Sequence, residues 1–366
     1  MRRRNLVVRA PGKVVLMDEE LPDVPPGGVL LRTLATGLSA GTELTFVKGD
    51  HPGLDERFDT ELGLFLPRNG DGADESAYPV TRLGYMEVAR VAESRTEAFA
   101  VGDVVATAYG HATAHVSDPL HEHLVRLPPD VNPLLGVYVA HVGPICANGL
   151  LHAAVDAVGP TTTGLGDGVA GRRVAVTGAG LIGLVTALFA RVHGAEEVVL
   201  IEEDPWRRAR AEALGFEALH GDDPGLVLKT RWRHGPGAHG ADVVFQCRGR
   251  TRALATALRI VRPQGTVVDM AFYTESGEAV GLGREFHHNG LSLVSAQIGR
   301  TPRGTAAFWD RPRLSAATIE LLRAEGRAIR RHLVTDVLPL DEAPELLMAL
   351  TARRRRVVSA IFTVEP

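Results

Sequence analysis

A glycine-rich segment in the middle of the chain has the spacing of a turn that binds phosphate. A short apolar run, residues 174–177, leads directly into Gly178, Gly180 and Gly183, and a segment with helical periodicity follows. Gly178 would permit a tight turn, Gly180 would let a pyrophosphate approach the backbone, and Gly183 would allow close packing of helix on strand. The strand, the turn and the helix therefore form the first half of a dinucleotide-binding pattern.

The residues after this turn supply the second half of the pattern. Free N–H groups at the start of the helix, including those of Leu181 and Ile182, would face the phosphates. A second apolar run ends in Glu202, 24 positions after the first glycine, where a carboxylate can accept hydrogen bonds from the ribose hydroxyls of an adenosine. A negative charge there repels a 2′-phosphate, so NAD(H) is favoured over NADP(H) unless Arg207 and Arg208 fold back to offset it.

The elements that must position this turn alternate along the middle of the chain. Strands are expected at 174–177, 198–201, 243–245 and 267–268, with helices from the glycine turn toward 193, at 206–214 and at 253–260. This alternation indicates a parallel, doubly wound α/β sheet. Cys247 follows the strand at 243–245, and we count it among the cofactor-binding residues.

The two ends of the chain have a different pattern. The N-terminal third is mostly β, with short strands at 6–8, 14–16, 29–34, 88–91 and 104–105. The last 50 residues are mixed, with helices expected at 316–324 and 342–350 and strands near Leu333 and Val357. Residues 49–79 are rich in Gly, Asp and Pro and predict a long surface loop, and residues 161–171 predict a linker into the middle domain.

Composition narrows the possible functions. The 366 residues are 45% hydrophobic and 23% charged, which fits a globular protein of two domains at roughly 150 residues each. Because 40 Lys and Arg face 44 Asp and Glu, binding of nucleic acid through phosphate neutralisation is not expected. Only two cysteines, Cys146 and Cys247, are present, which excludes a disulfide scaffold and fits a reducing compartment such as the cytoplasm. No apolar run could span a membrane, and Arg9 and Pro11 interrupt the N-terminal one, so no signal peptide is expected.

The order of these parts resembles the medium-chain dehydrogenase/reductase superfamily over nearly the whole chain. The segments that carry the resemblance are 37–43 (GLSAGTE), 84–87 (GYME), 101–105 (VGDVV), 143–144 (GP) and 332–343. The resemblance implies an α/β protein with a GroES-like, β-rich catalytic domain over 1–150 and 315–366. It also implies a Rossmann dinucleotide-binding domain, a doubly wound parallel sheet, over 151–314.

Within this resemblance, the ligands of the catalytic zinc are replaced. Ser39 or Ala40 stands where a cysteine is expected, Tyr85 replaces the histidine, Met86 the glutamate and Gly143 the third ligand. Zinc needs three or four thiolate, imidazole or carboxylate ligands, so we expect no metal. The chain resembles a zinc-free branch of the superfamily, most of all the group that contains bacteriochlorophyllide a dehydrogenase and threonine-dehydrogenase-like proteins.

Without a metal, side chains must handle the proton of the substrate. Tyr85 is the first candidate: with a free pKa of about 10 it suits a proton donor or hydrogen-bond orienter, although it could simply fill the space of the metal. Thr42 matches the residue that relays the substrate proton in the superfamily, or else it binds its own turn. His141 is the candidate base, with His152 and His111 as alternatives.

These features predict an NAD(H)-dependent, zinc-independent oxidoreductase that interconverts a secondary alcohol and a ketone of a small hydroxylated or cyclic substrate. Three alternatives stay open: a quinone or enoyl reductase, a cofactor-retaining epimerase, and a non-catalytic nucleotide-binding protein. Glu43, next to Thr42, is expected to fix a loop. The resemblance implies a homodimer, and neither nucleic acid nor a membrane is expected as a partner.

Overall fold

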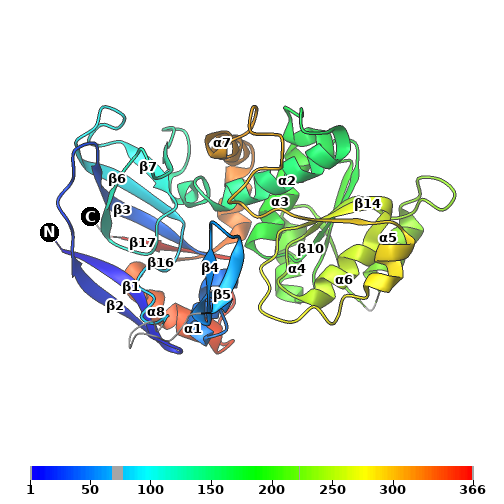
Figure 1. The fold of residues 1–366 in the computed structure, drawn as a ribbon, viewed down its shortest axis with the longest axis horizontal. Helices are drawn as coiled ribbons and strands as arrows, with labels where there is room; N and C mark the ends of the chain where they lie inside the picture. Colours follow the sequence, from blue (N-terminus) through cyan, green and yellow to red (C-terminus); the bar gives the residue numbers. More distant parts are fainter. Residues whose placement is uncertain (1, 68–76, 222, 365–366) are drawn as a thin grey trace. The chain divides into compact units, whose positions relative to one another are not determined.

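The chain divides into two compact units, each built around its own sheet (Figure 1). The computed structural model describes residues 2–67, 77–221 and 223–364. Unit 1 comprises residues 1–140 and 334–366, and unit 2 comprises residues 141–333. None of the helices within the described ranges is long and apolar enough to cross a membrane.

Unit 2 contains a six-stranded sheet in the order β12-β11-β10-β13-β14-β15, in which every neighbouring pair is parallel. The strands are β10 (Arg173–Thr177), β11 (Glu197–Ile201), β12 (Glu217–Leu219), β13 (Ala241–Gln246), β14 (Val261–Asp269) and β15 (Ser292–Ser295). Apolar residues fill β10 without alternation, as expected for a strand covered on both faces. The expected doubly wound α/β fold is confirmed.

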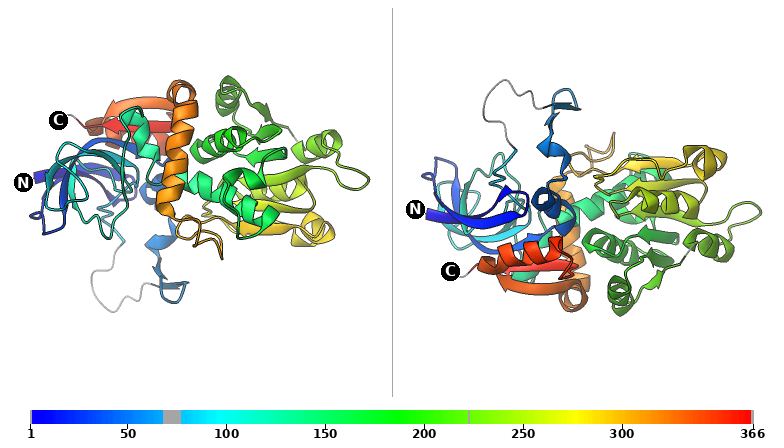
Figure 2. Two further views of the ribbon diagram at one scale, coloured as in Figure 1. Left: turned by 90° about the horizontal axis from the view of Figure 1, so that it is seen from above. Right: turned by 90° about the horizontal axis from the view of Figure 1, so that it is seen from below.

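Helices cover this sheet (Figure 2). They are α2 (Val142–Val158), α3 (Leu181–Val192), α4 (Pro205–Ala213), α5 (Pro224–Arg231), α6 (Thr251–Ile260) and α7 (Arg311–Ala328). The helices α2, α3 and α7 pack on one another, and α5 packs on α6. Because α2 and α7 pack together, both lie entirely in unit 2. The boundaries along the chain are therefore 140/141 and 333/334, whereas the sequence placed them at 150/151 and 314/315.

Unit 1 contains a seven-stranded sheet in the order β16-β17-β3-β6-β7-β9, with β8 also paired to β3. Its strands are β3 (Val29–Leu38), β6 (Glu87–Ser94), β7 (Val104–Thr107), β8 (Ala114–Ser117), β9 (Leu124–Arg126), β16 (Val334–Pro339) and β17 (Ser359–Thr363). β16 and β17 are parallel, and the other pairs are antiparallel. The C-terminal segment thus returns to complete the N-terminal sheet.

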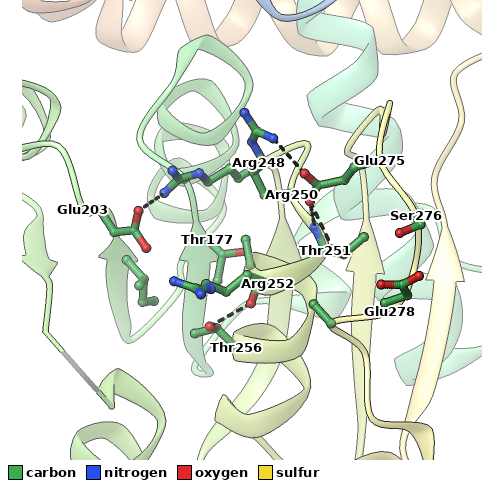
Figure 3. A pocket seen from close by; sticks show the side chains of 14 residues that line it. Thr177, Glu203, Arg248, Arg250, Thr251, Arg252, Thr256, Glu275, Ser276 and Glu278 are labelled. Atoms are coloured by element: carbon green, nitrogen blue, oxygen red, sulfur yellow. Dashed lines mark hydrogen bonds and ion pairs between the residues drawn. The ribbon is translucent and has the colours of Figure 1, made fainter. Parts of the chain in front are cut away.

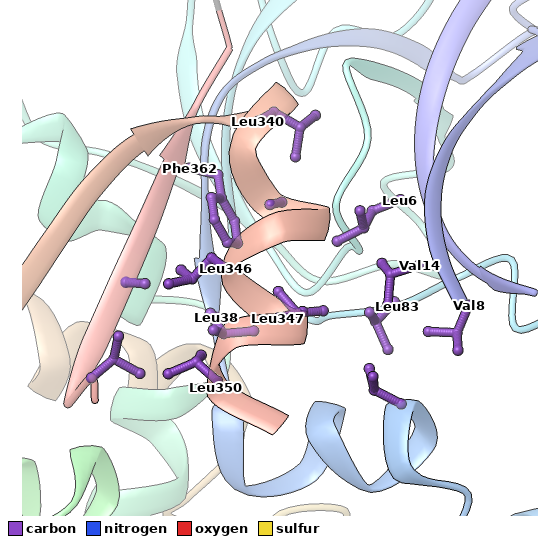
Figure 4. Packing of buried hydrophobic residues seen from close by; sticks show 14 residues of the cluster. Leu6, Val8, Val14, Leu38, Leu83, Leu340, Leu346, Leu347, Leu350 and Phe362 are labelled. Atoms are coloured by element: carbon purple, nitrogen blue, oxygen red, sulfur yellow. The ribbon is translucent and has the colours of Figure 1, made fainter. Parts of the chain in front are cut away.

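Two hairpins and two α-helices complete unit 1. They are β1 (Arg2–Ala10) with β2 (Lys13–Glu20), β4 (Glu56–Asp59) with β5 (Leu64–Pro67), α1 (Ala40–Lys48) and α8 (Ala343–Thr351). The apolar face of α8 packs into a cluster with β1, β3 and β17 (Figure 4). Leu346, Leu347 and Phe362 lie inside this cluster.

Two sequence-based expectations about loops were wrong. Residues 49–79 are not one long loop, because the hairpin β4–β5 forms within them and places the ring of Phe58 5.1 Å from that of Phe65, at a tilt of 55°; residues 68–76 lie outside the described residues. Residues 161–171 are not a linker, because they lie inside unit 2 and the short helix η3 (Leu165–Gly168) packs on α2. A Cβ at Gly168 would lie only 2.5 Å from the backbone of Ala153.

The cluster around α8 makes a testable prediction about stability. Leu347 is fully buried, so Leu347→Ala should lower the free energy of unfolding by about 3 kcal/mol through lost burial and the cavity it leaves. Leu62 is 64% exposed, so Leu62→Ala serves as a control that should change the free energy by less than about 0.5 kcal/mol. Urea denaturation followed by circular dichroism measures the free energy of unfolding of both variants. Equal losses of this free energy in the two variants would contradict the packing of α8.

Candidate active site

The turn between β10 and α3 has the backbone geometry that its glycines predict. Gly178 has φ = +98°, in the left-handed region that favours glycine. A Cβ at Gly183 would lie 1.8 Å from the carbonyl oxygen of Gly178, so only glycine lets the helix approach the turn. At Gly180, by contrast, the nearest atom to an added Cβ is the guanidinium of Arg207 at 3.8 Å. The space above Gly180 is therefore open, with a cation beside it.

The first turn of α3 exposes donors that suit an anion. The helix begins at Leu181, and Gly180 at its N-cap position supplies no side chain to cap the first N–H groups. The groups at the start of the helix, those of Leu181 and Ile182 among them, carry the positive end of the helix dipole. This end of α3 can accept a phosphate.

Glu202 has partners other than the ribose hydroxyls expected from the sequence. Its carboxylate is 3% exposed; one oxygen accepts the N–H of Ala179 and the other the N–H of Asp204, both at 2.9 Å. Glu202 therefore ties the glycine turn to the end of β11. Arg208, which with Arg207 could offset the charge of Glu202 by folding back, donates to the carbonyl oxygens of Glu202 and Glu203.

A cavity of about 480 Å³ opens beside the turn, at the carboxyl ends of β10, β11 and β13 (Figure 3). Ligands of open α/β sheets bind at this edge. Three glutamates line it, and the one beside β11 is Glu203, which is 66% exposed and pairs with Arg248 at 3.1 Å. On the other side, Arg250 pairs with Glu275 at 2.7 Å. The cavity thus carries charge of both signs.

The sequence reasoning missed this arginine-rich wall. Arg248, Arg250 and Arg252 follow β13 in the segment Arg-Gly-Arg-Thr-Arg, and all line the cavity. Arginines directly after a parallel strand were the available signal, because the carboxyl ends of neighbouring strands meet at one edge. The partner Glu275 lies in the segment after β14 and carried no comparable pattern.

The two cysteines lie near α3, Cys146 buried and Cys247 partly buried. Burial raises the pKa of the Cys146 thiol to about 12 and the pKa of the Cys247 thiol well above its usual value. The Cβ of Cys247 would lie 3.5 Å from a Cβ added at Gly183, so this residue packs beneath the turn. A neutral thiol is a poor nucleophile, and both cysteines are suited to packing.

The residues at the expected zinc positions of unit 1 form a cluster of hydroxyl groups. The Tyr85 hydroxyl donates to Oγ of Ser39 and lies 3.4 Å from Oγ1 of Thr42. Ser39 is the N-cap residue of α1, Thr42 lies in its first turn, and Tyr85 comes two residues before β6. Burial raises the pKa of Tyr85, the two hydroxyl contacts oppose the rise, and the charge of Glu43 adds to it. Ser39, Thr42 and Tyr85 are called the hydroxyl cluster below.

This set of residues does not fit a catalytic zinc ion. Hydroxyl, methyl and thioether groups stand where thiolate, imidazole and carboxylate ligands are needed. Met86 is buried and would contact a Cβ at Gly37 at 2.8 Å, and a Cβ at Gly143 would lie 2.1 Å from Thr318. Packing therefore leaves no room for a ligand side chain at position 143. No group of three or more His, Cys, Asp or Glu within the described residues could hold a metal ion.

The candidate histidines have different surroundings. His141 is the N-cap residue of α2 in unit 2, and its Nδ1 lies 2.5 Å from Nη2 of Arg311. A guanidinium only donates, so Nδ1 accepts and the neutral ring carries its hydrogen on Nε2. Burial lowers the pKa of His152 to about 4, and His111 is buried between Thr36 and Glu43. Tyr85 and Thr42 thus lie together in unit 1, whereas His141 belongs to unit 2.

Comparisons with known proteins agree with this architecture. Residues 182–310 match the family model described as zinc-binding dehydrogenase. The D-guloside 3-dehydrogenases of Shigella flexneri and Escherichia coli are 27% identical over 94% of this chain and 95% of theirs. The matched segment thus resembles zinc-binding dehydrogenases, and nearly the whole chain is similar to these two curated dehydrogenases.

Solved structures show the same fold. An alcohol dehydrogenase from Thermus sp. ATN1 matches with a TM-score of 0.72 at 19% identity, covering 99% of this chain and all of that one. A 2R,3R-butanediol dehydrogenase from Bacillus subtilis matches with a TM-score of 0.72 at 20% identity, covering 100% and 99% of the two chains. These likenesses show the fold, an α/β architecture that matches alcohol dehydrogenase structures with GroES-like and Rossmann domains.

The glycine turn makes a prediction that separates folding from binding. Gly183→Ala forces a Cβ against a backbone oxygen and should destabilise the protein by about 3 kcal/mol, with loss of NADH binding. Gly180→Ala meets open space, so it should leave the thermal midpoint nearly unchanged and weaken NADH binding several-fold. NADH fluorescence titration and thermal unfolding measure the two effects, with Gly277→Ala, whose Cβ also meets open space, as a control. Undiminished NADH binding by Gly183→Ala would contradict this geometry.

Proposed function

We propose that this protein is an NAD(H)-dependent, zinc-independent oxidoreductase that interconverts a secondary alcohol and a ketone. The observation that carries the proposal is the hydroxyl cluster, in which Tyr85, Ser39 and Thr42 stand where the superfamily's zinc chemistry would be. The open glycine turn and the cavity beside it support the dinucleotide. In this proposal unit 1 is the catalytic domain of the zinc-free branch and unit 2 the dinucleotide-binding domain.

The hydroxyl cluster supports proton donation. When bound, the nicotinamide supplies or accepts the hydride. Because burial raises the pKa of Tyr85, its hydroxyl stays protonated near neutral pH and suits a donor to the carbonyl oxygen in the reduction. Ser39 orients this hydroxyl, and Thr42 offers a second hydroxyl that passes a proton or orients the substrate oxygen. His141, with Nε2–H in its neutral form, is a further proton carrier in this proposal.

Two adjacent carboxylates support NAD(H) over NADP(H). Glu203 faces the cavity directly, and Glu202 lies buried behind it under the turn. A 2′-phosphate in this cavity would have to displace Arg248 from Glu203 and approach both negative charges. The pyrophosphate would then bind at the glycine turn, formed by Gly178, Gly180 and Gly183, next to the cation of Arg207. In this proposal Cys247 supports the turn from below.

The names of the relatives suggest the substrate class. Two of them are D-guloside 3-dehydrogenases, and a D-xylulose reductase of Saccharomyces cerevisiae is 32% identical over 34% of this chain and 33% of its own. We therefore propose a small hydroxylated compound, such as a sugar or polyol, as substrate. Turnover of quinones or enones instead, or cofactor binding without net turnover, would favour the alternatives raised by the sequence.

The role of Tyr85 is tested by removing one oxygen atom. Tyr85→Phe should lower kcat for ketone reduction by about a hundredfold or more, since a general acid contributes on that scale, while NADH binding stays unchanged. Tyr109→Phe is the matched control, because this tyrosine stacks on His115 outside the hydroxyl cluster. Both are assayed on a polyol and ketone panel with protein dialysed against EDTA. Activity that disappears on dialysis and returns with zinc would refute the metal-free mechanism.

Cofactor preference is tested on Glu203. The wild type should bind NADH at least several-fold more tightly than NADPH, because the 2′-phosphate meets the carboxylates at the cavity. Glu203→Gln removes one negative charge and the ion pair with Arg248, so it should reduce or reverse the difference in affinity between NADH and NADPH. Glu196→Gln, at an exposed carboxylate 4.0 Å from Arg173, is the control. Fluorescence titrations with both cofactors give the ratio of the two dissociation constants. Tighter binding of NADPH than of NADH by the wild type would exclude the proposed preference.

A further inference from the structure

A buried acid–histidine pair lies next to the hydroxyl cluster. Glu43 and His111 are 1% and 2% exposed, and Oε2 of the glutamate lies 2.8 Å from Nε2 of the ring. The other ring nitrogen lies 2.7 Å from Oγ1 of Thr36, so both nitrogens have partners. The superfamily resemblance assigns Glu43 only the fixing of a loop, and the sequence offers His111 only as an alternative to His141 as the base.

The pair contacts the backbone on both sides of the Tyr85–Ser39 hydrogen bond. Oε1 of Glu43 accepts the N–H of Ser39 at 2.7 Å. The carboxylate therefore holds Ser39, whose Oγ accepts the hydrogen bond from the Tyr85 hydroxyl. The His111 ring packs on Gly84, directly before Tyr85: a Cβ at Gly84 would lie 2.9 Å from the ring, and its φ is +93°. The backbone N–H of His111 also donates to the carbonyl of Leu83 at 2.8 Å.

These contacts join two segments that are far apart in the sequence. Ser39 begins α1, and Tyr85 lies in the segment that leads into β6. One residue of the pair holds the first segment, and the other residue packs on the second. Because the carboxylate and the ring are hydrogen-bonded to each other, movement of either segment would break a buried polar contact, which is costly.

We propose that Glu43 and His111 are positioning residues that hold the Tyr85 hydroxyl beside Ser39, at the point from which its hydrogen turns to the substrate oxygen. The inference rests on the proposed function, in which Tyr85 protonates the substrate oxygen. Glu43 acts in two ways: one oxygen fixes the backbone of Ser39, and the negative charge disfavours a tyrosinate nearby. His111 acts by holding the carboxylate and by packing on Gly84.

The charged and polar groups that act on Tyr85 are few among the described residues. Burial is the largest cause of its raised pKa, the neutral hydroxyls of Ser39 and Thr42 oppose the rise, and Glu43 adds to it. Reduction that depends on protonated Tyr85 is therefore complete at low and neutral pH and is lost as the pH rises through the pKa of Tyr85. Removing the charge of Glu43 should move this loss to lower pH.

A second buried acid–histidine pair in the same unit provides a matched control. Glu87 and His115 are as deeply buried, with Oε2 and Nδ1 3.4 Å apart. Glu87 accepts hydrogen bonds from Thr33 and Thr107, within the sheet. Burial opposes ionisation of Glu87, but His115 and these hydroxyls together lower its pKa. Glu87→Gln therefore removes a buried charge without touching the hydroxyl cluster.

The experiment follows the ionisation of Tyr85 directly. Tyrosinate absorbance is titrated with pH in each variant and in the same variant carrying Tyr85→Phe, and the difference reports Tyr85 alone. Glu43→Gln keeps the shape of the side chain and removes its charge, so the Tyr85 midpoint should fall to lower pH. Glu87→Gln should leave the midpoint where it is in the wild type. The alkaline limb of kcat for ketone reduction should shift with the absorbance in Glu43→Gln.

A second variant keeps the test decisive if Glu43→Gln does not fold. His111→Asn removes the ring but keeps the carboxylate, so Tyr85 should titrate no lower than in the wild type, while kcat falls because Ser39 and Gly84 are less well held. An unchanged midpoint in Glu43→Gln, or an equal fall in Glu87→Gln, would overturn the inference. Full activity of Tyr85→Phe would instead refute the proposed function, and the absorbance titration would still decide the role of the pair.

Discussion

The face of unit 2 proposed for the dinucleotide depends on one close approach, that of helix α3 to the carbonyl oxygen of Gly178. A side chain at Gly183 would collide with this oxygen, so the helix can lie against the turn only if position 183 lacks a Cβ. The approach also brings the start of α3, whose N-cap residue is Gly180, next to the turn. The cavity at the carboxyl ends of β10, β11 and β13 is therefore positioned by packing between backbone atoms.

The hydroxyl cluster changes what unit 1 can do chemically. A metal ion would bind the substrate oxygen and lower the pKa of an alcohol, whereas a tyrosine with a raised pKa holds its proton and offers it. In the proposed function, the replacement of thiolate, imidazole and carboxylate donors at these positions leaves the transfer of the substrate proton to Tyr85. Met86 and Gly143 are fixed by tight packing, so single substitutions could not easily restore a set of ligands.

The sequence predicted the glycine turn and the strands around it, which depend on local backbone sterics and on burial. The glycine spacing identified the turn, and apolar runs identified the strands around it, because both follow from local sterics and burial. The lining of the cavity could not be predicted, since Arg250 and Glu275 meet only when the segments after β13 and β14 come together. The hairpin at 56–67 was missed because its cross-strand pair, Phe58 with Phe65, lies in a polar, glycine-rich stretch.

Carboxylates were the residues whose roles the sequence predicted least well, and one physical pattern explains this. Glu202 and Glu43 both stand where an acid is expected to face a ligand or fix a loop, and in both the buried carboxylate accepts a backbone N–H from a site-forming segment, that of Ala179 or Ser39. A buried charge is tolerated when its oxygens are hydrogen-bonded, and it then resists movement of the loop. A sequence shows that an acid is present, but not whether its oxygens are used by a ligand or by the backbone. Here a buried glutamate fixes the glycine turn in unit 2, and another fixes the backbone of Ser39, whose Oγ accepts the Tyr85 hydrogen bond in unit 1.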